Sequence, residues 1–153
     1  MSIAEIEILY PKLCLHGYVH TSNEDPGYNC FAHALNDNGD WYSYLRVHGY
    51  YWPPTESAVP RDRRLNTFIK LFNYEGGFDP CDDGRLENGV EKVALYMNED
   101  KKVTHAARQL PDGKWTSKLG VKDDVTHELG SLEDPGTEKD DYGTVVQYLK
   151  RDI

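Results

Sequence analysis

The sequence contains few cysteines, no long apolar run and no excess of basic residues. Its three cysteines, Cys14, Cys30 and Cys81, are an odd number, and their spacing indicates no disulfide framework. No segment approaches the roughly 20 apolar residues of a membrane span, and the acidic start MSIAEIEI lacks the basic region and long apolar core of a signal peptide. These absences predict a cytoplasmic protein with no membrane partner, although export by a signal-independent route would leave no mark in the sequence.

Acidic residues outnumber basic ones, 26 to 17, and the formal net charge is −9. A protein that binds nucleic acid needs a cationic face that displaces counterions from the phosphates. The dense basic run from Arg61 to Arg64 is interrupted by Asp62. We therefore expect no nucleic-acid partner.

The patterns that are present fit a single domain, residues 1–153, of the α+β class. The length suffices for a sizeable core, and 39% of the residues are hydrophobic. A short helix is predicted with Asn29 or a nearby residue as its N-cap and Asn38-Gly39 as its end. Apolar residues three and four apart predict a second helix over 61–74, ended by Gly76-Gly77.

The second half of the chain has the pattern of an antiparallel sheet. Strands are predicted at 93–97, 103–110, 114–119 and 142–149, with a hairpin turn at Pro111-Asp-Gly113. The charged segment 121–141 is predicted to hold a short helix at 124–129 and a solvated loop at 138–141. Residues 41–60 are predicted to form an ordered aromatic loop packed over the body. Because the helices are separated from this sheet along the chain, the fold class is α+β.

Cys30 falls in the first turn of the predicted helix, which favours a chemical role. Backbone N–H groups there have no helical partner, and the positive end of the helix dipole favours thiolate over thiol. The same N–H groups can stabilise an oxyanion. The alternative is that Cys30 is a small apolar residue in a buried helix.

His105 is the candidate base. It lies in the predicted strand VTHAARQL, where alternation puts Val103, Ala107 and Gln109 on the same face. Small alanines beside it leave room for the helix to approach, which would bring Cys30 within hydrogen-bond reach. The alternative is a structural histidine with satisfied partners.

Two resemblances add to this pattern. A cysteine at a helix start, followed in a sheet by HAARQLPDGKW, resembles the layout of papain-like cysteine hydrolases, particularly their transglutaminase-like and cell-wall amidase branches. That resemblance implies a Cys-bearing helix packed on a small antiparallel sheet, a second helix in between, and a polar residue on the next strand that orients the histidine. The stretches YNCFAHA, EKVALY, THAARQL and KWTSKLG also resemble a widespread bacterial family of unknown function, which brings no established activity.

The residue that would orient His105 depends on the register of the next strand. With a two-residue turn, Lys118 shares the face of His105, and an ammonium group cannot accept the imidazole N–H. A shift by one residue brings Ser117 round instead, and Gln109 shares the face in either register. No carboxylate stands where the transglutaminase-like pattern puts its aspartate.

A set of metal-binding residue types offers a rival site. Zinc readily accepts such ligands, and five lie within about twenty residues: Cys14, His16, His20, Cys30 and His33. Their spacing matches no common zinc finger, and on a strand the first three would merely share a face. Without zinc, the histidines are surface or packing residues.

We therefore favour a papain-like cysteine hydrolase or acyl-transfer enzyme acting on an amide or thioester-like bond of a peptide or amide substrate. Cys30 would attack the carbonyl and His105 would move its proton. This hypothesis predicts no cofactor, no resident metal, and a Cys30 thiol that is partly accessible and reactive at neutral pH. The further candidates for orienting the base or lining the cleft are Asn29, Trp52, Gln109 and Ser117.

Two other hypotheses remain open at this point. One is a non-catalytic interaction module on the same fold, an accessory or immunity-type protein that binds a protein partner. The lack of an orienting carboxylate favours it. The other is a domain held together by a structural zinc.

Overall fold

The computed structural model describes residues 3–119, 123–133 and 142–153, which form a mixed α+β fold. The strands are β1 Tyr18–Ser22, β2 Trp41–Tyr42, β3 Tyr50–Tyr51, β4 Asp79–Cys81, β5 Val90–Met97, β6 Val103–Gln109, β7 Trp115–Lys118, β8 Asp124–His127 and β9 Thr144–Asp152. The helices are α1 Ile3–Leu9, α2 Pro11–His16, α3 Cys30–Ala34 and α4 Leu65–Gly76, with 3-10 turns η1 Thr55–Ser57 and η2 Leu129–Leu132.

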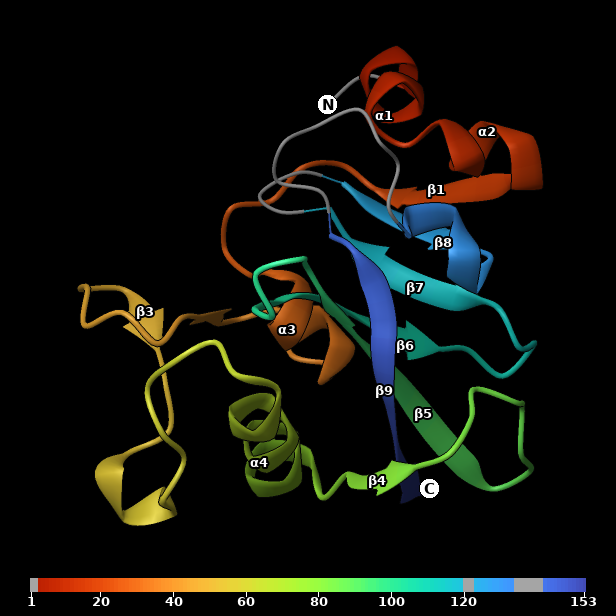
Figure 1. Ribbon diagram of the computed structural model, residues 1–153. Coiled ribbons are helices and arrows are strands. Elements are labelled where there is room, and N and C mark those ends of the chain that lie inside the picture. Colours follow the sequence, from red (N-terminus) through yellow and green to blue (C-terminus); the bar gives the residue numbers. More distant parts are fainter. Residues whose placement is uncertain (1–2, 120–122, 134–141) are drawn as a thin grey trace.

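The centre of the fold is a seven-stranded antiparallel sheet with the order β1-β8-β7-β6-β5-β9-β4 (Figure 1). One hydrophobic cluster packs α3 and α4, through Ala32 and Phe68, on the face that includes Ala106. A second cluster packs α1, α2 and η2, among them Ile6, on the face that includes Ala107. Adjacent residues of β6 therefore enter different cores, as strand alternation requires.

The helix that carries Cys30 begins where the sequence predicts. The side chain of Asn29 is its N-cap and accepts a hydrogen bond from the Ala32 N–H at 3.3 Å. The helix ends earlier than predicted, because Asn36 adopts a left-handed conformation, with φ 60°, that stops the helical turn. The amphipathic helix predicted over 61–74 is α4, which begins after the basic run and ends at Gly77.

The sheet is larger than predicted. Strands are present where the sequence predicts them, at 93–97, 103–110, 114–119 and 142–149. The helix predicted at 124–129 is wrong, because the alternating segment Asp124–His127 is strand β8 and pairs with both β1 and β7. The Cys-bearing helix is preceded by α1, α2 and β1, and the loop predicted at 138–141 lies outside the described residues.

The aromatic segment 41–60 is ordered, as predicted. It holds β2, β3 and η1, and Trp41 pairs with Tyr50 while Tyr42 pairs with Tyr51 in a short parallel ladder. Among the residues that the structure describes, no helix is long and apolar enough to cross a membrane.

Gly143 marks a point where the chain entering β9 passes too close to β5 for any side chain. Its φ is +82°, and an added Cβ would lie 2.0 Å from the Met97 carbonyl oxygen. Gly89 has a similar φ of +76° but no neighbouring atom within 4 Å. A side chain at either glycine would strain the backbone, but only at Gly143 would it also overlap with neighbouring atoms.

We expect Gly143→Ala to lower the free energy of unfolding by at least about 3 kcal/mol, because overlap with the backbone of Met97 adds to the strain. Gly89→Ala should cost about 1–2 kcal/mol from the left-handed conformation alone. Urea denaturation of both variants measures the difference. Equal losses would show that the close approach at Gly143 is absent.

Candidate functional site

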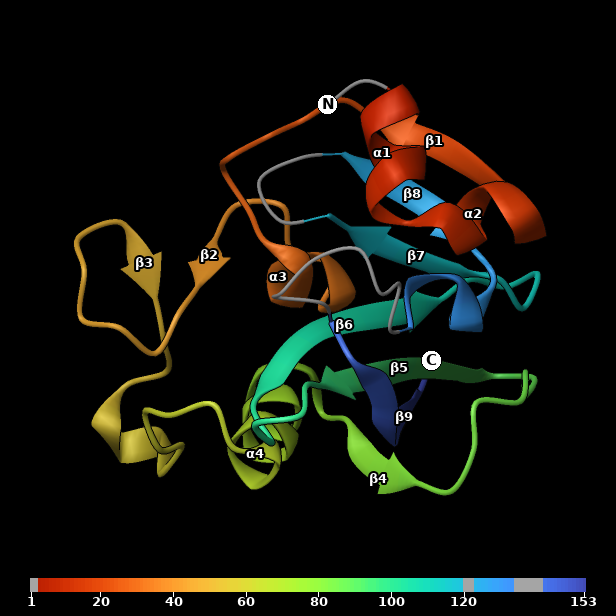
Figure 2. The same ribbon diagram turned by 45° about the horizontal axis from the view of Figure 1, so that its top comes forward.

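Cys30 lies where the ladder between β6 and β7 opens. In the described residues, the last pair of that ladder on this side is Arg108↔Thr116, although the same register would place Ala106 opposite Lys118. The Ala106 N–H and the Lys118 ammonium both act on the Cys30 thiol, so the sulfur lies close to this opening. Figure 2 shows α3 beside β6 and β7, which brings the first helical turn to the gap.

The environment of Cys30 differs from the expectation of an accessible, acidic thiol. Its side chain is buried, with 7% of the residue exposed. Burial raises the pKa of the thiol to about 12, although the N–H groups of Ala106, Phe31 and Cys30 itself act to lower it. Desolvation therefore outweighs the helix-start effect that the sequence suggested.

His105 is fully buried on β6 and is held between two aromatic rings. The ring of Tyr142 stacks on it with centroids 4.1 Å apart and an interplanar angle of 8°. Tyr96 meets its edge at 5.1 Å. Because aromatic contacts of this kind fix the plane of a ring, the imidazole has one well-defined orientation.

The register of β7 settles which residue orients His105. The hairpin turn has three residues rather than two, because the Leu110 N–H donates to the Lys114 carbonyl at 2.7 Å. Gly113, with φ +88°, makes this turn. The alternative register of the sequence analysis is therefore the observed one, and Ser117 shares the face of His105.

A chain of hydrogen bonds runs from His105 across the sheet. The Nε2 of His105 lies 3.0 Å from Ser117 Oγ, and Ser117 Oγ lies 2.7 Å from His127 Nε2. The Nδ1 of His127 lies 2.7 Å from the Glu128 carbonyl oxygen. These three side chains are at most 1% exposed, so water does not compete for their bonds.

The Glu128 carbonyl determines which atom donates and which accepts in each bond of this hydrogen-bonded chain. A carbonyl oxygen only accepts, so the Nδ1 of His127 carries the hydrogen and its Nε2 accepts from the Ser117 hydroxyl. The Ser117 oxygen then accepts from the Nε2–H of His105. The remaining nitrogen, His105 Nδ1, is left as a bare acceptor, and it is buried with no hydrogen-bond partner among the described residues.

Burial keeps both histidines of this chain neutral. It lowers the pKa of His105 well below the ordinary value, and nearby His127 and His33 add to the effect. Burial also lowers the pKa of His127 to about 4, against the bond to the Glu128 carbonyl. His105 is therefore an unprotonated imidazole whose Nδ1 can accept a proton. The structure does not place Cys30 within hydrogen-bond reach of that nitrogen, because α3 packs on the sheet face of Ala106 whereas His105 lies on the opposite face with Ala107.

The other predicted site residues lie elsewhere. Asn29 caps α3 and also donates to the Tyr42 carbonyl at 2.6 Å, which makes it a support of the helix start. Gln109 donates to the Gly84 carbonyl at 2.8 Å and has no bond to the histidine. Trp52 is buried against α4, with its indole N–H donating to the Pro60 carbonyl, so it belongs to the core rather than to a cleft wall.

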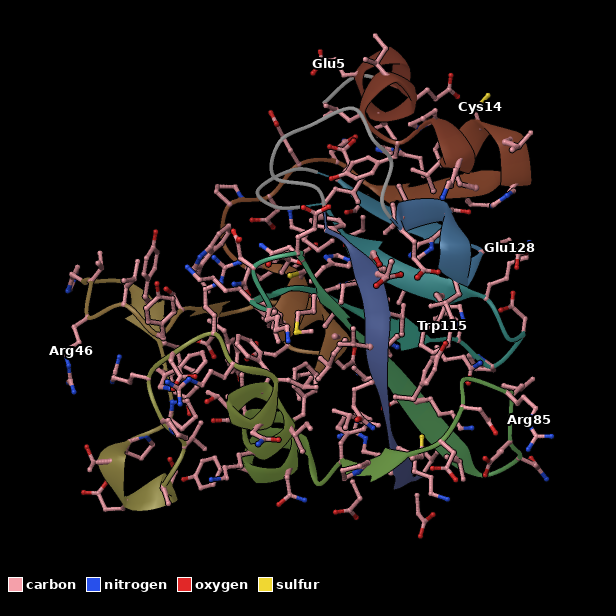
Figure 3. The ribbon with its side chains drawn as sticks, in the orientation of Figure 1. Glu5, Cys14, Arg46, Arg85, Trp115 and Glu128 are labelled. Carbon is pink, nitrogen blue, oxygen red and sulfur yellow. The ribbon has the colours of Figure 1, made fainter. Side chains whose placement is uncertain are left out.

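The residues considered as zinc ligands do not lie together in the fold. Cys14 is exposed at the outer surface of α2 (Figure 3), whereas Cys30 is buried. His16 and His20 hydrogen-bond to a serine of η2 and to Asp123, respectively. Across residues 3–119, 123–133 and 142–153, no three His, Cys, Asp or Glu side chains are arranged to hold a metal ion.

Most of the chain matches a known protein family. A profile of the family described as a domain of unknown function (DUF7689) matches residues 19–150. The chain belongs to this family. No curated protein and no solved structure matches it.

The whole hydrogen-bonded chain lies within the DUF7689 match. Sequence reasoning missed one member of that chain, His127, and also Tyr142, which stacks on His105. His127 could have been found from the alternation in DVTH, which puts it on the same face as buried Val125. Tyr142 carries no such signal, because its stacking on His105 joins segments that are distant in sequence.

A second polar network of this DUF7689 domain lies on the face that α3 covers. The Tyr28 hydroxyl donates to Asp124 at 2.6 Å, and His33 lies 2.9 Å from the Thr116 hydroxyl. The Lys118 ammonium sits 4.9 Å from the centre of the Tyr28 ring. Burial lowers the pKa of His33, although Asp124 opposes that shift. This network fixes α3 on β7 and β8.

A histidine that stays neutral when folded makes stability depend on pH. An unfolded histidine takes up a proton below about pH 6.5, whereas His127 resists protonation down to a pKa of about 4. The unfolded state binds more protons in that interval, so the free energy of unfolding falls as the pH drops from about 6.5 to about 4. The contribution of His127 to this fall should be about 3 kcal/mol.

We expect His127→Asn to make the free energy of unfolding less dependent on pH in that interval, as measured by urea denaturation at several pH values. His48→Asn, at an exposed position, is the control for removing a histidine. Identical pH profiles for wild type and His127→Asn would contradict the buried neutral state of His127.

Proposed function

We propose that this protein is a papain-like cysteine hydrolase or acyl-transfer enzyme acting on an amide or thioester-like bond. Cys30 is the nucleophile and His105 is the base. The observation that supports this most is the fixed polarity of the Ser117–His127 chain, which leaves His105 Nδ1 as a buried acceptor without another partner. A structural histidine in a core ordinarily has both nitrogens satisfied.

In the proposed reaction, the Cys30 sulfur attacks the substrate carbonyl carbon while His105 Nδ1 takes the thiol proton. This transfer requires the thiol to turn toward His105 through the opening of the β6–β7 ladder, because α3 and His105 lie on opposite faces of the sheet. The backbone N–H groups of Cys30 and Phe31, which lie at the sulfur, stabilise the oxyanion. The protonated imidazole keeps its Nε2–H bond to Ser117 and then gives the Nδ1 proton to the leaving group. Water or another acceptor releases the acyl group from the sulfur, and the thiol re-forms.

The raised pKa of Cys30 limits how this chemistry can proceed. A thiol with a pKa of about 12 carries almost no thiolate at neutral pH, so the proton must leave as the carbon–sulfur bond forms. Ser117 supports that transfer, because it holds the tautomer of His105 in which Nδ1 is free. The proposed reaction therefore depends on proton transfer to His105 during the attack rather than on a preformed ion pair of Cys30 and His105.

Alkylation of the native protein tests the proposal. With iodoacetamide at neutral pH, we expect His105→Gln to slow modification of Cys30 by about 10²–10⁴-fold, because the base is lost. Ser117→Ala should slow it by about 10-fold through loss of the tautomer control. Peptide mapping by mass spectrometry follows each cysteine separately, and exposed Cys14 serves as the internal reference.

Two controls make the result specific. Thr21→Ala, at an exposed position of β1, should leave the Cys30 rate unchanged. Partial unfolding of a variant would expose Cys30 and speed its reaction, which is opposite to the expected effect. If Cys30 reacts at the same rate with and without His105, or reacts only in denaturant, the catalytic proposal fails.

A second candidate function is a non-catalytic interaction module on the same fold. The burial of Cys30 and its raised pKa favour this alternative. In that case His105 and Ser117 serve stability alone. Their substitution would then lower the free energy of unfolding without slowing the reaction of Cys30 in the native state.

A further inference from the structure

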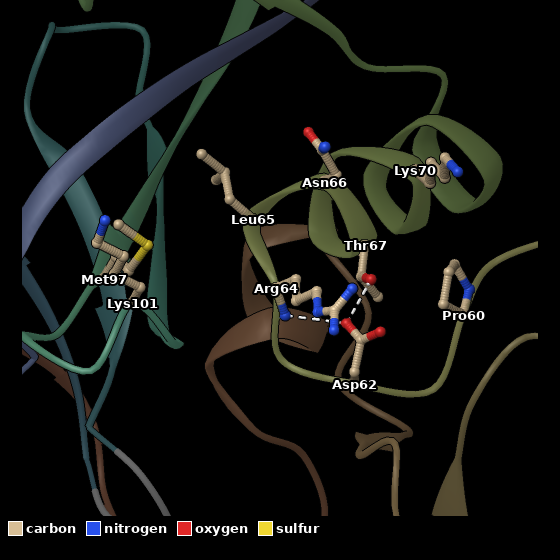
Figure 4. A pocket seen from close by; sticks show the side chains of 9 residues that line it. All are labelled: Pro60, Asp62, Arg64, Leu65, Asn66, Thr67, Lys70, Met97 and Lys101. Atoms are coloured by element: carbon tan, nitrogen blue, oxygen red, sulfur yellow. Dashed lines mark hydrogen bonds between the residues drawn. The ribbon is translucent and has the colours of Figure 1, made fainter.

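Two adjoining hollows meet at the start of α4 and the turn between β5 and β6. Their volumes are about 530 and 470 Å³, and Asp62, Arg64 and Lys101 line both. Figure 4 shows the larger hollow, with Met97 and Lys101 on one side and the first turn of α4 on the other. We call the two together the basic groove.

The basic groove is cationic in a chain whose formal net charge is −9. Its two acidic lining residues are Asp62 and Asp100. Its basic lining residues are Arg61, Arg63, Arg64, Lys70, Lys101 and Lys102. None of these six side chains forms an ion pair with a carboxylate of the described residues, although the charge of Arg64 acts on the Asp62 carboxylate. Six cations against two carboxylates leave the groove with an excess of positive charge.

The aspartate that interrupts the basic run does not neutralise it. The Asp62 carboxylate accepts a hydrogen bond from the Thr67 hydroxyl at 2.5 Å and another from the Arg64 N–H at 3.0 Å (Figure 4). Burial acts to raise the pKa of Asp62, but these bonds outweigh it and lower the pKa. The Oδ1 of Asp62 thus serves the start of α4.

Two of the arginines are held in place without losing charge. Arg61 donates to the Tyr44 carbonyl at 2.8 Å, and Arg63 donates to the Val103 carbonyl at 3.1 and 3.2 Å. A carbonyl orients a guanidinium but carries no formal charge to cancel it. Arg64 and Lys101 are exposed beside them. Because Arg61 and Arg63 are already held in place, their side chains lose less conformational entropy when a ligand binds.

We propose that the basic groove binds a short acidic segment of a peptide or protein. Arginine forks match carboxylates in bidentate geometry. Pro60, Leu65 and Met97 lie between the cations and offer apolar contact to the backbone and side-chain methylenes of a peptide. A long polyanion such as nucleic acid would also meet the acidic remainder of the surface, so a short segment is favoured.

The groove lies near the candidate catalytic residues but does not depend on them. Arg63 contacts Val103, and Val103 is three residues from Ala106 on β6, about 10 Å along the strand. The proposal stands on the groove's own charges, and its test is a binding measurement that needs no activity.

Fluorescence anisotropy with a labelled hexaglutamate peptide tests the proposal on the full chain. At about 20 mM salt, where screening is weak, we expect saturable binding that weakens as salt is added. Arg64→Glu/Lys101→Glu should weaken binding at least about 10-fold, because attraction becomes repulsion. Lys114→Glu/Lys150→Glu, which makes the same change in net charge at exposed positions elsewhere, should weaken it less than about 3-fold.

Four outcomes would overturn the proposal, three with charged ligands and one with a neutral peptide. The first is an absence of hexaglutamate binding at low salt, and the second is an equal loss in the two charge-reversal variants. The third is tighter binding of a six-nucleotide single-stranded DNA than of hexaglutamate, which would assign the groove to nucleic acid. A labelled hexaglutamine peptide should not bind, and binding of that peptide would show that carboxylates are not recognised.

Discussion

All four side chains of β7 are buried, because α3 covers one face of the sheet and α1, α2 and η2 cover the other. A buried polar group costs about 1–3 kcal/mol unless it finds a partner. Thr116 and Ser117 therefore each bond to a histidine, one on each face of the sheet. The polar networks of Thr116 and Ser117 both follow from this one constraint.

In the network of Ser117, every donor and acceptor role is fixed, and these roles determine which atom of His105 can take a proton. A backbone carbonyl at Glu128 fixes the hydrogen on His127, and the effect passes through Ser117 to His105. The same burial that orders these bonds also raises the pKa of Cys30 and lowers that of His105. Cys30 and His105 are therefore both neutral at rest, and charge would appear on them only during a reaction.

Charge is distributed differently at the start of α4. In the sequence, Asp62 breaks the basic run from Arg61 to Arg64, and the chain as a whole is acidic. In the fold, the carboxylate of Asp62 is occupied by the Arg64 N–H and the Thr67 hydroxyl, while the turn between β5 and β6 adds further lysines. A cationic surface thus arises from segments that are separated in sequence.

Local interactions along the chain specify the individual helices and strands. Asn29 marks the start of the helix that carries Cys30, and periodicity locates α4 and four strands, because capping and alternation act within a few residues. The register in which the strands pair depends on the fold as a whole. A turn of two residues and a turn of three are both compatible with PDG, yet one residue of register exchanges Lys118 for Ser117 beside His105. The contacts of His127 and Tyr142 with that site likewise depend on strand order, which local sequence does not encode.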